Sequence, residues 1–467
     1  RTNLSYENYL FDSYEYAAND VGYAASVGGR VTQNRDISTT LNFINSLNFN
    51  KDFGLHNVQA DLIQESYQFK IDALGANATG YLPGVKVLNG STTPEGVRGF
   101  VNEERLSSYL ARVAYNFDDK YFIEGSYRRD GSSRFSTDTR WGDFYAVGAS
   151  WVISDEEFLR NNQAISFLKL KSSYGELGNN QGIGYFPYLQ LFNTGWNELD
   201  NTGVLIGGVT DPFLTWETTA SFNAGLDFGF FNNRLEGLVE YYNKESVDLI
   251  YDQPLPISTG NESITTNVGS IRNYGWEFTL NSRIITGADF NWSAGLNFSM
   301  DENEITELTQ ESFINGSKRW EEGKSLYDFY IQEWAGVDPE DGYGMWYTDV
   351  LDDNGNPTGE RETTKEYSEA TRYYQGSSLP DIVGGFNTDL TFGNWDFNAL
   401  LSFSFGAQVY DSSYSGLMAG FSRPGYQQSP NLEDRWQQPG DQTDVPLLLS
   451  AQNDFAAQST RFLFDND

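Results

Sequence analysis

The 467-residue chain has no cysteine, which excludes disulfide bridges and thiolate metal sites. It has one histidine, His56, so a histidine-rich metal centre is excluded as well, and we expect no metal ligands. Basic residues are few, since 30 Lys and Arg stand against 65 Asp and Glu for a net charge of −35. Because nucleic acid is bound through basic patches, this balance argues against nucleic acid as a partner. No run of eighteen apolar residues occurs, so no transmembrane helix is expected.

The most informative pattern that is present is strict alternation of apolar and polar residues, as in residues 290–300. Alternate side chains of a strand point to opposite faces, so each such strand has one apolar and one polar face. The alternating runs reach about ten to fifteen residues, the length a tilted strand needs to cross a bilayer and longer than most strands of soluble sandwiches. Aromatic residues make up 16% of the chain. We therefore predict an all-β protein, a large antiparallel transmembrane β-barrel of a Gram-negative outer membrane, in contact with its lipids.

Alternation also predicts which side chains face lipid and which face the lumen. Trp141 and Trp151 are ten residues apart on one strand face, about 23 Å across a membrane at a tilt of about 45°, which suits the two aromatic girdles of a barrel. The predicted girdle residues are Trp141, Trp151, Tyr121, Trp292 and Trp395. The predicted lumen residues, on the opposite faces, are Arg112, Glu124, Arg128, Glu236, Glu240 and Asp396.

The connections alternate in length. Short turns are expected at 51–54, 118–120, 231–233, 287–289 and 393–394, and a short capped helix near 154–159. Long extracellular loops are expected at about 71–103, 179–215, 251–270, 301–380 and 411–460. Short periplasmic turns and long outer loops are the construction of bacterial barrels, here with about a dozen strands. We expect the chain to be part of a longer protein, because it begins at Arg1 without a signal peptide and we expect a further strand to begin at 461–464, close to its end.

The sequence motifs that would indicate catalysis or metal binding are incomplete or absent. The triplet Gly323-Lys324-Ser325 lacks the glycine of a phosphate-binding loop at position 318. The acidic run 349–356 lacks the spacing and the closing glutamate of a calcium loop, although one loosely bound Ca²⁺ in an acidic loop stays an alternative to a simple turn. No nucleophile elbow or zinc motif occurs, so we expect no enzyme and no cofactor.

The long loops are rich in aromatic residues. Two roles fit them equally: stacking on sugar or peptide faces of a cargo, or packing the loops against one another and against a partner. The candidates for contact with substrate or partner are Trp196, Trp320, Trp334, Tyr343, Trp346 and Tyr347.

Three segments together resemble the SusC/RagA-like TonB-dependent transporters of Bacteroidetes outer membranes. They are residues 121–135 followed by 141–159, residues 168–179, and residues 322–339, which contain YFIEGSYRRDGSSRF, LKLKSSYG and EGKSLYDFY. The resemblance covers nearly the whole chain. It implies a barrel of 22 strands when complete, with an N-terminal plug domain that this chain lacks together with the terminal strands.

The resemblance further implies import of large nutrients, oligosaccharides or peptides. A SusD-like surface lipoprotein would capture the cargo, and TonB would supply energy through the missing N-terminal region. Two alternatives stay open: a SusC-like structural subunit of a larger outer-membrane complex, and a secreted β-rich glycan-binding module or adhesin. Neither the cargo nor the oligomeric state follows from the sequence.

Overall fold

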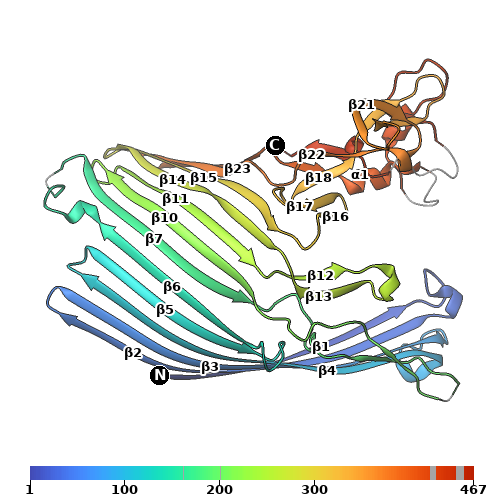
Figure 1. Ribbon diagram of the computed structural model, residues 1–467, viewed down its shortest axis with the longest axis horizontal. Helices are drawn as coiled ribbons and strands as arrows, with labels where there is room; N and C mark the ends of the chain where they lie inside the picture. Colours follow the sequence, from blue (N-terminus) through green and yellow to red (C-terminus); the bar gives the residue numbers. More distant parts are fainter. Residues whose placement is uncertain (161, 200, 421–426, 449–456, 467) are drawn as a thin grey trace. The chain divides into compact units, whose positions relative to one another are not determined.

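The computed structural model describes residues 1–160, 162–199, 201–420, 427–448 and 457–466, and the principal element is a 13-stranded sheet (Figure 1). The strand order is β1-β2-β3-β4-β5-β6-β7-β10-β11-β14-β15-β23-β24, so strands that follow one another in the main sheet are neighbours. This antiparallel meander confirms the predicted all-β fold class. The chain divides into two compact units: residues 1–151, 172–221 and 246–268, and residues 152–171, 222–245 and 269–467.

Most strands of the main sheet are longer than the five or six residues typical of globular proteins. Those that begin in the first unit are β1 (Thr2–Ala17), β2 (Arg30–Phe53), β3 (His56–Tyr81), β4 (Ser91–Phe117), β5 (Tyr121–Ser132), β6 (Trp141–Val152) and β10 (Glu217–Phe230). The others are β7 (Ile165–Asn179), β11 (Leu235–Val247), β14 (Ser270–Thr286), β15 (Phe290–Glu307), β23 (Ile382–Phe392) and β24 (Trp395–Phe405).

The turns that join these strands are short, as predicted. Gly54 and Gly393 each open a two-residue turn with φ of 67° and 58°. Tight hairpins need this left-handed conformation because it matches the twist of the strands, and glycine adopts it without steric cost. The predicted capped helix at 154–159 is instead a single 3₁₀ turn, Ile153–Asp155, with no side-chain cap.

The largest difference from the sequence prediction concerns the loop at about 71–103. Strands β3 and β4 stay paired up to Tyr81 and Ser91, so the loop outside the strands spans only 82–90 (Figure 1). The sequence analysis expected a loop here because apolar alternation fades in this region. The backbone ladder needs no apolar face to continue.

The other long connections contain small sheets of their own. These are β8 (Phe192–Thr194) with β9 (Val204–Ile206), and β12 (Ile250–Pro254) with β13 (Ser263–Asn267). Between β15 and β23 lie β16 (Ser312–Asn315), β17 (Lys318–Glu321), β18 (Asp328–Gln332), β19 (Trp334–Val337), β20 (Gly344–Leu351), β21 (Pro357–Thr364) and β22 (Arg372–Ser377). We call residues 308–381 the loop module.

The further strand expected at 461–464 is present in part, as a three-residue strand outside the main sheet. The segment after β24 contains β25 (Gln408–Tyr410), helix α1 (Ser412–Leu417) and this three-residue strand, β26 (Leu463–Asp465), which pairs with β25. Part of the predicted loop 411–460 lies outside the described residues. The remaining short 3₁₀ helices are Ala25–Val27, Leu88–Gly90, Ile257–Thr259, Tyr367–Glu369, Pro430–Asp434 and Thr460–Phe462.

One hydrophobic cluster, Val31, Ala78 and Tyr81, lies at the loop-side ends of β2 and β3, and two others lie mostly in the connections. In the first unit Phe135, Phe144, Ile183, Leu214 and Trp216 form one cluster beside the β5–β6 connection. In the second unit Met418, Leu432 and Phe462 form another. Among the described residues, none of the helices has the length and apolar character required to span a bilayer.

Candidate functional site

The register of β2–β6 arranges the side chains of one sheet face into levels. Residues directly opposite in an antiparallel ladder share a face. On the face that carries Val113, which we call the outer face, the level next to the short turns is aromatic. In this level, neighbouring rings lie close together. The distance between ring centroids is 4.9 Å for His56 and Phe117, 6.3 Å for Phe117 and Tyr121, and 6.3 Å for Tyr121 and Trp151.

Four levels further toward the long loops, the outer face turns polar. This polar level consists of Asn45, Gln64, Tyr109, Arg129 and Asp143. Asn45 donates to Gln64 (2.9 Å), and the Arg129 guanidinium lies 3.7 Å from the Asp143 carboxylate. The three levels in between carry mostly Val, Leu, Ile, Ala, Gly and Tyr.

The spacing of these levels fits a bilayer. Tyr121 and Arg129 are eight residues apart on β5, about 26 Å along the strand and about 19 Å across a membrane at a tilt of about 45°. The apolar band of outer-membrane barrels is about 25 Å tall and is bordered by aromatic residues. The outer face of β2–β6 therefore has the pattern of a lipid-facing wall.

Three of the predicted girdle residues, Tyr121, Trp151 and Trp141, lie on the outer face of β5 and β6, and their role as a membrane girdle stays a prediction. Tyr121 and Trp151 pair in the aromatic level. Trp141 lies one level beyond the polar level, with its ring 6.4 Å from Tyr109 and 5.4 Å from the Arg129 guanidinium. In the second unit, Trp292 donates to Thr388 (2.9 Å), and Trp395, next to the turn of β23 and β24, is 79% exposed.

The opposite, inner face of β3–β5 carries charged residues in pairs. Arg112 contacts Glu124 (2.6 Å) and Asp61 (3.6 Å), and Arg128 contacts Asp130 (2.7 Å) and Glu65 (3.7 Å). The structure thus brings predicted lumen residues of neighbouring strands together. Asp61 and Glu65 escaped the sequence analysis because only the strand register places Asp61 opposite Arg112 and brings Glu65 on β3 within reach of Arg128 on β5.

The predicted lumen residues of the second unit are also charged contacts on the sheet. Glu240 binds Lys171 (2.7 Å), which also lies 3.6 Å from Asp227, and Glu236 is 3.9 Å from Arg283. Asp396 is exposed beside the β23–β24 turn. A polar face lined with paired charges can pass a hydrated cargo without a large uncompensated charge.

A buried ion pair lies on the loop side of the polar level. Arg134 donates to both carboxylate oxygens of Glu104 (2.7 and 2.8 Å) and to the Ile183 carbonyl (2.5 Å). Asn180 donates to Glu104 (3.3 Å) and to Ser132 (3.0 Å). The motif YFIEGSYRRDGSSRF contains Arg134, but only the fold shows that this arginine ties the β7–β10 connection to β4.

The loop aromatics divide into exposed and packed residues. Trp196 is 62% exposed and Tyr343 is 37% exposed, so their rings are available for contact. Trp320 packs on Phe313 at 5.1 Å, and Tyr347 lies under the Arg361 guanidinium at 4.6 Å. Trp346 is only 2% exposed and packs edge-on against Trp334 at 5.3 Å, so Trp346 offers no surface to a cargo. Local sequence could not separate these roles because burial depends on the neighbouring strands.

Burial shifts the pKa of two cations in the connections. It lowers the pKa of Lys318 to about 8, although nearby Asp328 acts in the opposite direction. The Lys318 amine donates to the Tyr327 carbonyl and to Ser378 (3.0 Å). Burial also lowers the pKa of Arg461 to about 10. Both groups belong to the packing of the connections and not to a reactive site.

Metal-ligand geometry gives no candidate centre in the described part of the chain, where no three acidic or histidine side chains converge. In the acidic run 349–356, the Asp352 carboxylate accepts from the backbone N–H groups of Asn354 and Asn356 (both 2.9 Å). These hydrogen bonds form the turn between β20 and β21 and lower the pKa of Asp352. A loosely bound Ca²⁺ there stays a prediction.

Comparisons with known proteins agree with this geometry. The family model described as "TonB dependent receptor-like, beta-barrel" matches residues 1–410. The TonB-dependent receptor P3 of Formosa agariphila is 31% identical over 450 residues, which cover 90% of this chain and 44% of that protein. The TonB-dependent receptor SusC of Bacteroides thetaiotaomicron is 30% identical over 339 residues, 67% of this chain and 32% of SusC.

A solved structure is similar over almost the whole chain. One chain of the RagAB peptide transporter has a TM-score of 0.85 and 27% identity, and the match covers 99% of this chain and 51% of that one. The chain thus spans about half the length of this structure and less than half of the two curated relatives. With the family model matched along most of its length, the chain belongs to the TonB-dependent receptor β-barrel family and is of the SusC/RagA type.

Proposed function

We propose that the complete protein imports large nutrients, oligosaccharides or peptides, across the outer membrane of a Bacteroidetes-like bacterium. The observation that carries this proposal is the paired-charge inner face behind an apolar outer face, in a chain of SusC/RagA type. A wall that is apolar toward lipid and polar toward the lumen suits passage of a hydrated cargo. The proposal assigns no enzymatic step to the chain.

The proposal includes two partners. A SusD-like surface lipoprotein would capture the cargo at the loop end, and TonB would supply energy through a region outside this sequence. Support comes from the relatives, one of which is SusC and another the RagAB complex, described as a peptide transporter. The exposed rings of Trp196 and Tyr343 lie in the connections on the loop side, where such a partner or a cargo would be met.

The experiment is a pull-down of the tagged full-length protein from native outer membranes in mild detergent, followed by mass spectrometry. The expected result is one surface lipoprotein in stoichiometric amount. Recovery of a secretion or glycan-display machine would replace import by the structural-subunit alternative. A protein that stays soluble without detergent would support the adhesin alternative.

Cargo class and energy are tested separately. Uptake of labelled oligosaccharides and labelled peptides is measured in cells with and without a functional TonB. Uptake of one class that disappears without TonB supports the proposal and names the cargo. Uptake that continues without TonB would contradict it.

A further inference from the structure

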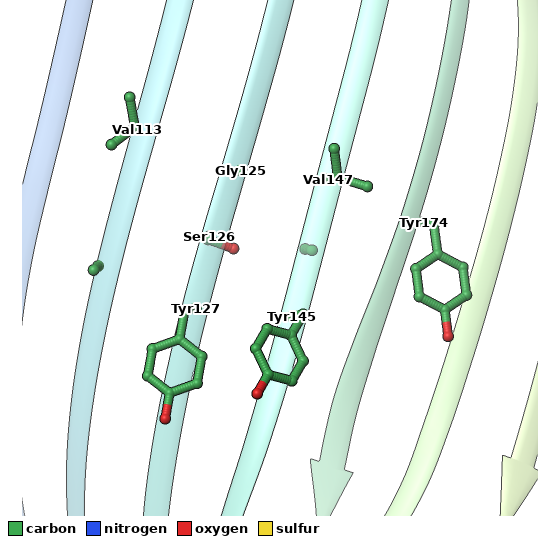
Figure 2. A pocket seen from close by; sticks show the side chains of 9 residues that line it. Val113, Gly125, Ser126, Tyr127, Tyr145, Val147 and Tyr174 are labelled. Atoms are coloured by element: carbon green, nitrogen blue, oxygen red, sulfur yellow. The ribbon is translucent and has the colours of Figure 1, made fainter.

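Strands β1–β4 carry their inner face well beyond the polar level, into a region that the site described above does not include. Figure 2 shows the opposite, outer face of the sheet between the aromatic and the polar level, with Val113, Tyr127 and Tyr145 among the labelled side chains. Phe100 lies on the inner face of β4, nine residues beyond Tyr109 of the polar level. That is about 30 Å along the strand and about 21 Å higher at a tilt of about 45°. This part of the inner face therefore lies outside the bilayer, on the side of the long loops.

The strand register places two exposed rings at the ends of one row across this face. The row consists of Phe11 on β1, Asp36 on β2, Ala73 on β3 and Phe100 on β4. The two phenylalanines are 45% and 43% exposed, whereas Ala73 is buried. Because neighbouring strands lie about 4.8 Å apart, the ring-bearing strand positions are about 14 Å apart along the sheet. Tyr9, one row nearer the membrane on β1, adds a third exposed ring.

The floor between the rings is polar, and its side chains hold one another in place. Arg98 on β4 reaches across β3, where Nε donates to Oδ1 of Asn34 (3.3 Å) and Nη2 to Oδ1 of Asp36 (3.3 Å). The Asn34 amide in turn donates to Ser13 on β1 (3.2 Å). Gly75 lies between them on β3, and a Cβ atom there would meet Asn34 Oδ1 at 2.5 Å and Arg98 Nε at 2.7 Å. The glycine thus leaves the space in which the guanidinium crosses the strand. We call Tyr9, Phe11, Asn34, Asp36, Arg98 and Phe100 the upper wall.

The upper wall combines two kinds of group that suit a carbohydrate. Exposed aromatic rings pack against the apolar face of a sugar ring. The side chains of Asp36 and Arg98 are 24% and 47% exposed, and their mutual contact is long, so both can form further hydrogen bonds. A hydroxyl group donates and accepts, so neighbouring hydroxyl groups of one sugar can bind the carboxylate and the guanidinium together.

The charge of this region favours a neutral glycan over an anionic one. Arg98 already faces the carboxylate of the floor, and Arg30 binds both carboxylate oxygens of Glu95 at 2.7 and 2.8 Å. Glu7 and Glu15 add two exposed acidic residues on the inner face of β1. A sulfated or uronic-acid polymer would therefore meet paired arginines and surplus carboxylates, which repel it.

The backbone of the floor argues against a peptide. Extended peptides commonly bind by adding a strand to an open sheet edge. Along the floor, β2 and β3 are each paired with a neighbouring strand on both sides, so they present side chains and no open edge. We propose that the upper wall binds a neutral oligosaccharide, whose sugar rings stack on Phe11 and Phe100 and whose hydroxyl groups bind the polar floor. This inference rests on the import proposed above and narrows its cargo to glycans.

The experiment measures binding to the full-length receptor, purified in mild detergent with any lipoprotein that accompanies it. An array presents neutral oligosaccharides, sulfated and uronic-acid oligosaccharides, and peptides of similar length. We expect binding to members of the neutral set. The affinity of the strongest neutral binder is then measured by calorimetry for each variant, and heat-dependent gel mobility shows that the variant is folded.

Two matched pairs of variants test the rings and the floor. Phe11→Ala removes an exposed ring of the upper wall, while Tyr6→Ala removes an exposed ring from the outer face of the same strand. Asp36→Asn removes a carboxylate that faces an arginine on the inner face, while Asp12→Asn removes one that binds Arg35 on the outer face. We expect Phe11→Ala and Asp36→Asn each to weaken binding about tenfold, through loss of ring stacking and of a hydrogen bond to a charged group. Both controls should leave the affinity unchanged.

Other outcomes would overturn the inference. Binding to no neutral oligosaccharide, or stronger binding of peptides or anionic oligosaccharides, would exclude the proposed occupant. Equal losses in Phe11→Ala and Tyr6→Ala would place the glycan elsewhere. Loss of an accompanying lipoprotein from Phe11→Ala would make the upper wall a contact with that partner.

The two proposals fail separately. TonB-dependent uptake of peptides alone would keep import and overturn the glycan site. Glycan binding that depends on Phe11 and Asp36, without TonB-dependent uptake, would keep the glycan site and overturn import.

Discussion

Arg134 and Glu104 form a bidentate ion pair with N···O distances of 2.7 and 2.8 Å. Only 9% of the surface of Arg134 and 6% of that of Glu104 is exposed to solvent. Through Asn180 and the Ile183 carbonyl, this pair fastens the start of the β7–β10 connection to the middle of β4, on its inner face. The aromatic cluster of Phe135, Phe144 and Trp216 packs beside it. A long connection is thereby held by one charged contact and one small core.

Removing one partner of this pair should destabilise the connection. Glu104→Gln leaves the buried Arg134 guanidinium without its counter-charge, at a cost of about 3 kcal/mol. Limited proteolysis of the full-length protein should then cleave within residues 181–215 faster than in the unchanged protein. Arg35→Gln is the control, because its pair with Asp12 is exposed and contributes about 0–1 kcal/mol. Equal cleavage of both variants would contradict a structural role for the buried pair.

The levels of the outer face predict at which positions along a strand a new charge can be tolerated. Val113→Arg places a cation in the middle of the apolar band and should cost about 2–4 kcal/mol of folding free energy. Ser107→Arg, on the same face of the same strand but beyond the polar level, should cost about 0–1 kcal/mol. Denaturant unfolding in lipid vesicles measures both values. The reverse order would mean that the membrane lies at another height on β4.

The same levels can be mapped chemically, because these 467 residues contain no cysteine. A single cysteine at Val113 should stay unlabelled by a membrane-impermeant maleimide on intact cells. A cysteine at Val97, which is 87% exposed on the extended part of β4, should be labelled. Labelling at both positions would contradict the assignment of the outer face to lipid.

Lys318 should make the loop module sensitive to alkaline pH. Its pKa of about 8 lies below the ordinary value of about 10.4, so the folded module binds this proton less tightly than the unfolded chain does. The charged amine therefore weakens the module below about pH 8, and stability should rise as the pH increases from about 8 to about 10.4.

Competitive acetylation followed by mass spectrometry measures this titration, since only the neutral amine reacts. The reactivity of Lys318 should reach half its maximum near pH 8. Asp328→Asn should move the midpoint lower, because the Asp328 carboxylate raises the pKa. A midpoint near that of Lys318 in the denatured protein would show that the amine is not buried.

Arg361 should hold the exposed strand β21 in place. Its guanidinium lies 4.6 Å from the ring of Tyr347 and 4.1 Å from that of Tyr373, and it binds Glu333 at 2.7 Å. Arg361→Lys keeps the charge but loses the planar stack, so hydrogen exchange in residues 357–364 should quicken about three- to tenfold. Glu360→Gln, one residue earlier on the exposed strand, is the control. Unchanged exchange in Arg361→Lys would leave the strand held by its ladder alone.

The sequence by itself determined the class of this protein. Alternation in 290–300 and the short turns at Gly54 and Gly393 are local properties, and each predicted an element that the structure contains. The charged inner face followed as well, because a period of two assigns Arg112 and Glu124 to the face opposite Val113.

Only the tertiary structure decided how these elements line up. The pairing of Asp61 with Arg112, the row that holds Phe11 and Phe100 and the burial of Trp346 all depend on register between strands that are distant in sequence. Beyond the polar level the β3–β4 ladder continued where alternation faded, since backbone hydrogen bonds form there without an apolar face. Register and burial are non-local, because the sequence of one strand does not specify which residues of the neighbouring strand lie opposite it.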